Sequence, residues 1–177
     1  MVFGSVNGER IQLNENSLWM GGPRDTNNPD ALEHLAEVRR LLFASHPAQA
    51  IVMRLSADTP GTITVSAWID RQQDATTEVA GNDRLNLIGG LAGGKGLAFL
   101  ASVKILADGG RLDAYPERIY AQGANTVTLI VAAATSYRGN DHRAAVERSL
   151  AAAIKTPYEK LKADHVADHQ QFFRKRR

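Results

Sequence analysis

Cysteine is absent from this chain of 177 residues. Its absence excludes a disulfide framework, a thiolate nucleophile and a cysteine-rich zinc site. Aromatic residues make up 6% of the chain and hydrophobic residues 44%, with a mean hydropathy of -0.27, which is ordinary for a globular domain. A chain near this length buries about 70% of the surface that its unfolded form exposes, so a core forms without cross-links.

Long hydrophobic runs are also absent. The longest, Thr128–Ala134, is far shorter than the roughly 18 residues that a transmembrane helix needs. The first residues lack the basic segment followed by an apolar one that marks a signal peptide. The sequence as given therefore predicts no membrane partner.

Excess positive charge is confined to the last four residues, 174–177. The chain has 21 basic and 19 acidic residues, a net charge of +2, and without that tip 17 basic residues face 19 acidic ones. A nucleic-acid-binding domain carries clustered basic side chains on a folded face. The balanced body of the chain predicts no nucleic-acid partner.

The first part of the chain predicts a β-hairpin and then a helix. The runs Val2–Val6 and Glu9–Leu13 flank Asn7-Gly8, a dipeptide that favours a tight hairpin turn. Residues 14–28 are polar and rich in breakers, which predicts an irregular segment. Apolar residues at helical spacing then predict a helix near residues 29–45, inserted in the β-rich part of the chain.

A series of strands without intervening helices is predicted from residue 51 onward. The predicted strands are Ile51–Ser56, Thr62–Ile69, Thr76–Ala80, Arg84–Ile88, Leu97–Leu106, Arg111–Ala114, Arg118–Ala121 and Thr126–Ala134. Apolar residues alternate strictly from Leu97 to Ile105, so one face of that strand should look at a core. The fold class predicted is mainly β, an antiparallel, incomplete supersandwich-like β-sandwich.

The end of the chain predicts a helical pair. Asp141–Ile154 is rich in alanine, and Thr156 and Glu159 stand at capping-box spacing before a second helix. We therefore divide the chain into a β-sandwich domain at 1–137 and a C-terminal helical linker segment at 138–177.

Two motifs resemble ligand sites only in part. Residues 89–95 match a phosphate-binding loop, but Gly96 stands where a serine or threonine should bind magnesium, and a strand pattern follows. The segment is therefore predicted to be a hairpin loop. His165 and His169 lie one helical turn apart, but they continue an apolar stripe with Leu161, which favours packing over metal binding. We predict no metal and no cofactor.

The segment that follows the first hairpin concentrates groups suited to sugars. Asn14, Glu15, Trp19 and Arg24 offer an indole face for stacking together with amide and charged groups for hydroxyls. The alternative is that Trp19 plugs one end of the sandwich while the amides bond to loop backbone. Both interpretations stay open, and the four residues are the predicted substrate-binding residues.

The same segment belongs to a longer resemblance. The stretches that carry it are Met1–Gly4, Arg10–Glu15, Leu18-Trp19, Gly21–Asp25, Asn27–Leu32, Val38–Phe43, Val127–Leu129, Ala132–Tyr137, His165–Gln170 and Phe173-Arg174. In these stretches the chain resembles the N-terminal domain of glycoside hydrolase family 95, the α-L-fucosidase family. The match extends from the first residue to the last and is looser in the middle.

The resemblance implies a β-supersandwich that precedes an (α/α)6 barrel. It further implies hydrolysis of α-linked L-fucose with inversion, by a glutamic acid and an asparagine–aspartate base arrangement. Those catalytic residues belong to the barrel, so none is carried over to a position of this chain. The implied partners are the barrel domain and fucosylated glycans. Members of the family are often exported whereas this chain shows no leader, so the localisation stays open.

One departure from the family pattern lies inside the domain. Several strands of the pattern are missing where Ala50 meets Ile51. Removing strands from a sheet exposes unpaired backbone groups, so we expect either re-pairing across the gap or an aggregation-prone edge.

These observations predict a non-catalytic domain that scaffolds an absent (α/α)6 barrel and is inactive alone. The alternatives are a free-standing carbohydrate-binding module that uses Trp19, and a decayed fragment with no activity. A cooperative thermal transition would argue against the decayed fragment.

Overall fold

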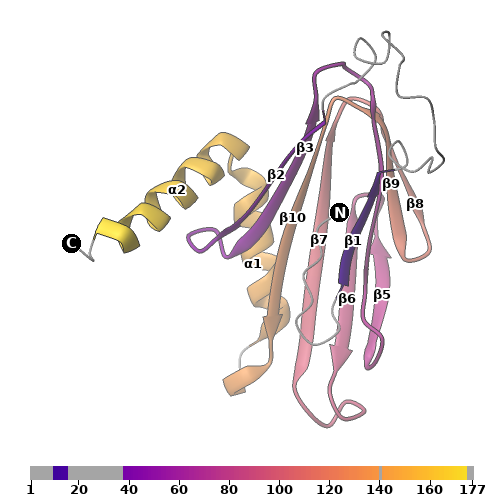
Figure 1. Cartoon of the computed structure of the whole chain (residues 1–177). Coiled ribbons are helices and arrows are strands. Elements are labelled where there is room, and N and C mark those ends of the chain that lie inside the picture. Colours follow the sequence, from indigo (N-terminus) through magenta and orange to yellow (C-terminus); the bar gives the residue numbers. More distant parts are fainter. Residues whose placement is uncertain (1–9, 16–37, 140, 175–177) are drawn as a thin grey trace, which may run out of the picture.

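The structure, a computed structural model, describes residues 10–15, 38–139 and 141–174. Its ten strands form two sheets that face each other, with two helices behind the larger sheet (Figure 1). The four-stranded sheet has the order β1 (Arg10–Glu15), β4 (Ile63–Asp70), β9 (Arg118–Ala124), β8 (Arg111–Tyr115). The six-stranded sheet has the order β2 (Val38–Ser45), β3 (Ala50–Ala57), β10 (Thr126–Thr135), β7 (Ala98–Asp108), β6 (Arg84–Gly90), β5 (Ala75–Ala80).

Every strand pair in the two sheets is antiparallel, and together they confirm the predicted β-sandwich class. Each strand predicted from residue 51 onward is present within a few residues of its expected bounds. Turn residues separate the strands, and short connections favour pairing between sequence neighbours. The predicted succession of strands along the chain is confirmed, and some of the pairs, such as β3 with β10 and β4 with β9, join strands that are not sequence neighbours.

The main core lies between the two sheets. Its side chains come from alternate positions of the facing strands, including Val65, Leu85, Ile105, Ile119 and Leu129. The predicted alternation of β7 is confirmed, because Val103 and Ile105 face this core while Leu100 faces the helices. Period-two alternation thus gives β7 two apolar faces.

A second core lies on the outer face of the six-stranded sheet. Helix α1 (His142–Lys155) buries Val146, Leu150 and Ala153 against β3, β7 and β10, and α2 (Tyr158–Arg174) adds Leu161. Figure 1 shows α1 lying along β10 and α2 projecting past β2. Both predicted C-terminal helices are confirmed, and they share a core with the sheet.

The capping box predicted before the second helix does not form. The Thr156 hydroxyl donates to the carbonyl of Ala152 at 2.9 Å, and the Thr156 amide donates to the carbonyl of Ala153. Thr156 therefore closes the end of α1, whose unpaired carbonyls need donors. At the other end of α1, a carboxylate oxygen of Asp141 accepts from the Ala144 amide at 3.0 Å.

The predicted helix near residues 29–45 is wrong for residues 38–45, which form strand β2. Its residues pair in register with β3, from Val38 opposite Ala57 to Ser45 opposite Ala50. A short apolar run does not distinguish a strand from a helix by spacing alone, so the available partner strand decides. Residues 29–37 lie outside the described part of the chain.

The β2–β3 hairpin corresponds to the first of the two outcomes expected at the internal junction. Strands on either side of the shortened segment pair through a turn at residues 46–49. β2 is then the edge of the six-stranded sheet, with Leu41 48% and Leu42 44% exposed. Pairing with β2 thus satisfies the backbone hydrogen-bonding groups of β3, and β2 becomes the edge strand of the sheet.

The opening hairpin is described only in its second strand. β1 pairs along β4, with Arg10 opposite Asp70 and Glu15 opposite Val65. The prediction that residues 14–28 are irregular is wrong for Asn14 and Glu15, because pairing with β4 extends the strand to Glu15. The first hairpin strand, Val2–Val6, lies outside the described residues.

Candidate functional site

The structure describes the backbone of two of the four predicted sugar-binding residues. Asn14 and Glu15 end β1, opposite Ser66 and Val65 of β4. Trp19 and Arg24 lie outside the described residues. β1 therefore carries Asn14 and Glu15 to one end of an edge strand, and the sugar-stacking interpretation stays a prediction.

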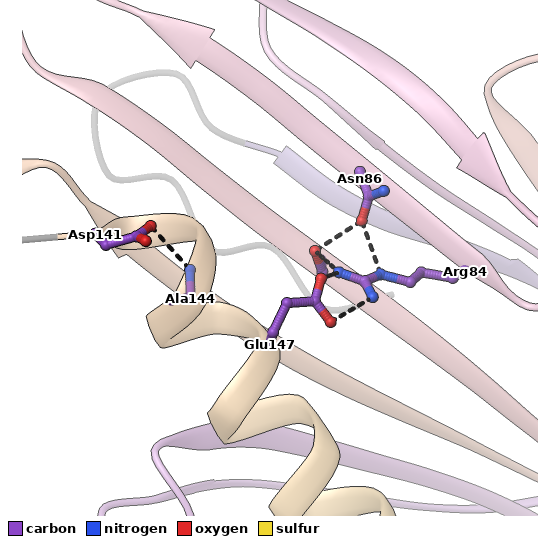
Figure 2. Close-up of polar contacts among 6 residues, drawn as sticks. Arg84, Asn86, Asp141, Ala144 and Glu147 are labelled. Carbon is purple, nitrogen blue, oxygen red and sulfur yellow. Dashed lines mark hydrogen bonds and ion pairs between the residues drawn. The ribbon is translucent and has the colours of Figure 1, made fainter.

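The most extensive polar cluster of side chains joins the larger sheet to α1 (Figure 2). The Arg84 guanidinium on β6 donates to Asn86 Oδ1 at 2.9 Å, to Ser102 Oγ at 3.0 Å and to Glu147 of α1. The Ser102 hydroxyl on β7 donates to Asn86 Oδ1 at 2.7 Å. Ser102 is 0% exposed, so its hydroxyl requires a partner within the protein.

This cluster has a structural role and not a catalytic one. A catalytic serine needs a base that takes its proton, whereas Ser102 donates to an amide oxygen, which is not a base. Arg84 pairs with both oxygens of Glu147 and so joins α1 to β6. A two-pronged pair of this kind fixes direction as well as distance. The cluster therefore orients α1 on the sheet.

The hydrogen-bonded contact with Arg84 lowers the pKa of the Glu147 carboxyl below its usual value. Hydrogen bonds from Arg84 are the largest cause, slight burial acts in the opposite direction, and Coulombic attraction to Arg84 adds to the lowering. A carboxyl whose pKa is lowered by folding contributes stability above its unfolded pKa and loses it as the pH falls through the folded value. The pair should therefore stabilise the protein at neutral pH and cease to do so in acid.

Replacing Glu147 with glutamine is expected to lower the free energy of unfolding at pH 7 by no more than about 1 kcal/mol, because the Glu147 side chain is 58% exposed and solvent screens the pair. The difference from wild type should vanish as the pH falls below the lowered pKa of Glu147. Urea denaturation at pH 7 and in acid measures both values. Glu78→Gln, at an exposed position of β5, is the matched control, and an equal loss in that variant would contradict the role of the pair.

Of the two histidines on α2, His165 lies as the packing interpretation predicts, whereas His169 is exposed. The His165 ring stacks on Phe43 of β2 with ring centroids 5.0 Å apart, and its centroid is 6.0 Å from that of His169. Within the described residues, no group of three or more histidine, cysteine or acidic side chains is arranged to hold a metal ion. His165 thus serves to dock α2 on the sheet edge.

The glycine-rich segment forms the predicted hairpin loop between β6 and β7. The Leu91 amide donates to the carbonyl of Leu97, and Gly93 and Gly94 adopt positive φ angles of 62° and 86°. β7 begins at Ala98, so a strand follows where a phosphate-binding loop would lead into a helix. The prediction of a loop is confirmed.

Sequence reasoning missed the cluster of Arg84, Asn86, Ser102 and Glu147. Two signals could have indicated it. Arg84 and Asn86 are two residues apart and so share one face of a strand, and Ser102 interrupts an apolar strand. The pairing of Asn86 with Ser102 depends on the register between β6 and β7, which the sequence alone does not specify.

Neither helix in the described part of the chain has the length and apolar character needed to cross a membrane.

Two comparisons with known proteins bear on the fold and on the family. The family model described as "Glycosyl hydrolase family 65, N-terminal domain" matches residues 1–44 and 40–140. The two matched segments meet beside β2 and β3, where the sequence departs from the expected pattern.

A curated relative is similar over a shorter stretch. Alpha-L-fucosidase 2 of Arabidopsis thaliana is 43% identical over 49 residues, which are 28% of this chain and 6% of that protein. The chain therefore spans only a small part of the relative's length. The predicted resemblance to a glycoside hydrolase N-terminal domain is confirmed, with family 65 as the matched model where the sequence indicated family 95. The chain belongs to the family of glycosyl hydrolase family 65 N-terminal domains.

Proposed function

We propose that this domain braces the catalytic domain of a glycoside hydrolase that acts on α-L-fucosides and that it is inactive by itself. The observation that carries the proposal is the family match over residues 1–44 and 40–140. The local similarity to alpha-L-fucosidase 2 supports the sugar class. The partner proposed is the (α/α)6 barrel that the sequence resemblance implies.

The position of α2 supports a bracing role. Leu161 and His165 hold one face of this helix of 17 residues against the sandwich. The helix then projects past β2, so that its far end stands clear of the sheets (Figure 1). Val166 is 42% exposed on α2. A second domain that packed on the exposed face of α2 would bury the apolar side chain of Val166, which would favour the association.

Binding between this chain and a catalytic domain tests the proposal. The purified chain should release no nitrophenol from 4-nitrophenyl α-L-fucoside above a blank. When immobilised, it should retain the separately produced catalytic domain of alpha-L-fucosidase 2. Val166→Asp should weaken retention by placing a charge in the contact, whereas Lys95→Asp, in the distant β6–β7 loop, should not.

Two results would contradict the proposal. Hydrolysis of the fucoside by the isolated chain, equal in independent preparations and abolished by heat, would show that the chain is itself an enzyme. Failure to retain the catalytic domain under conditions in which the chain is folded would remove the bracing role.

A further inference from the structure

A cavity of about 310 Å³ lies between the outer face of the larger sheet and the corner where α1 meets α2. Its floor is formed by β3, β7 and β10, and its wall by the residues around the helix corner. Pockets that hold small ligands have volumes of about 300–1,000 Å³. This cavity is near the lower limit, which suits a single small ring.

The floor of the cavity is polar because of the sheet register. Arg54 lies opposite Thr128 in the pairing of β3 with β10, and Thr126 lies opposite Asp108 in the pairing of β10 with β7. These side chains share one face of the sheet, on the side of the helices. Toward the other end of the same face, Val52 and Ile130 are covered by α1. The polar pairs of the cavity floor therefore lie just beyond the part of the sheet that α1 covers.

Arg54 has hydrogen-bonding capacity that the described residues leave unused. Its guanidinium lies 4.7 Å from the Tyr158 ring centroid, and one nitrogen donates to Thr128 Oγ1 at 3.4 Å, which is a long bond. A guanidinium has five N–H donors. A ligand with several acceptors in the cavity would use the donors that remain.

Tyr158 supplies a second unused group. Its hydroxyl is buried and has no hydrogen-bond partner among the described residues. Burial raises the pKa of the Tyr158 hydroxyl, the nearby charge of Glu159 raises it further, and Arg54 opposes the two. The hydroxyl therefore stays protonated at neutral pH and can donate. A buried donor without a partner costs stability that a ligand oxygen would restore.

The charges that line the cavity balance each other. Arg54 and Asp108 are the charged residues among the described lining, one of each sign. Hydroxyl groups both donate and accept, so they match a guanidinium, a carboxylate and threonine hydroxyls together. Leu106, Ile154 and Leu161 complete the lining with apolar surface. An uncharged ligand with many hydroxyls and an apolar face fits this combination.

We propose that the cavity between Arg54, Thr128, Asp108 and Tyr158 is a binding site for a neutral monosaccharide. Its lining residues in the described part of the chain include none of the four residues predicted from the sequence to bind sugar, and they do not include Val166 of the proposed contact with a catalytic domain. It does not rest on the bracing function. The guanidinium and the carboxylate bind ring hydroxyls from two sides, and the apolar wall contacts the C–H face of the sugar.

Titrations with four sugars test the proposal, monitored by 15N-resolved NMR of the full chain. The probes are L-fucose, D-glucose, D-glucuronate and D-glucosamine, of which the last three share one ring and differ in charge. At least one of the two neutral sugars should bind with millimolar affinity, shifting the amides near Arg54, Thr128 and Tyr158. Its affinity should not change between low and high salt, since the ligand has no charge to screen.

Two variants locate the site. Asp108→Ala changes an exposed residue, and Arg54→Met keeps the alkyl length while removing the donors. Each should weaken binding of the neutral sugar by about tenfold. Asp70→Ala, at an exposed end of β4 in the other sheet, is the matched control and should bind as wild type does.

Three results would overturn the proposal. The first is no saturable shift with either neutral sugar up to about 0.1 M, well above a millimolar dissociation constant. The second is binding of glucuronate alone with strong salt dependence, which would identify an anion site. The third is unchanged affinity in both Asp108→Ala and Arg54→Met, which would place the sugar elsewhere.

Discussion

Replacing Leu85 with alanine is expected to lower the free energy of unfolding by about 2–5 kcal/mol. Leu85 lies on β6, is 0% exposed and packs in the core between the two sheets. Its strand is hydrogen-bonded to β5 on one side and to β7 on the other, so the backbone cannot move inward to fill the space. Urea denaturation should show a lower midpoint with an unchanged slope.

Leu41→Ala is the matched control for this prediction. It removes the same atoms from the sheet edge at β2, where Leu41 is 48% exposed, and should change the free energy of unfolding by less than about 0.5 kcal/mol. Equal losses in the two variants would contradict a core centred between the sheets. A cooperative wild-type transition in the same experiment would contradict the hypothesis of a decayed fragment.

Most of the sandwich could be predicted because its strands carry local signals. β4 shows why: Ile63, Val65, Ala67 and Ile69 face the core at every second position, and the residues between them are more exposed. Alternation of this kind specifies both the strand and its inward face without knowledge of its partners. Short turns then favour antiparallel pairing of sequence neighbours such as β5 with β6 and β6 with β7.

β2 could not be predicted because its conformation depends on tertiary contacts and not on local spacing alone. The segment from Val38 to Ser45 has apolar residues at spacings that suit a helix as well as a strand. Pairing with β3 and the contact of Phe43 with Tyr158 and His165 hold it extended. The two ring contacts of Phe43 join residues far apart in sequence, and together with the β2–β3 hairpin they outweigh local propensity.

The polar contacts likewise fall into local ones, which the sequence can indicate, and long-range ones, which it cannot. Asp141 caps α1 through a bond to Ala144, three residues away, and such a cap is readable from sequence. Arg84 meets Glu147 across 63 positions of the chain, and Arg54 meets Thr128 across 74. The first contact requires the docking of α1 beside β6, and the second requires the register of β3 with β10. The sequence therefore indicated neither the cluster at α1 nor the cavity at the helix corner.

Replacing Leu150 with alanine is also expected to lower the free energy of unfolding by about 2–5 kcal/mol. Leu150 is 2% exposed on α1 and packs in the outer core with Val52, Leu100 and Ile130. The measurement follows the helix and strand signals of circular dichroism together through urea denaturation. Ile154→Ala, on the same helix but 36% exposed, is the control and should lose less.

The coincidence of the two signals tests whether residues 138–177 are a separate linker. β10 is buried on both faces, with Val127 and Leu129 in the inner core and Ile130 and Ala132 in the outer one. A strand shared in this way cannot lose one core without weakening the other, so Leu150→Ala should shift both signals to the same lower midpoint. Loss of the helix signal ahead of the strand signal would show instead that α1 unfolds independently, as a linker would. Because the Arg84–Glu147 pair also joins α1 to β6, the coupled result is the one that the contacts support.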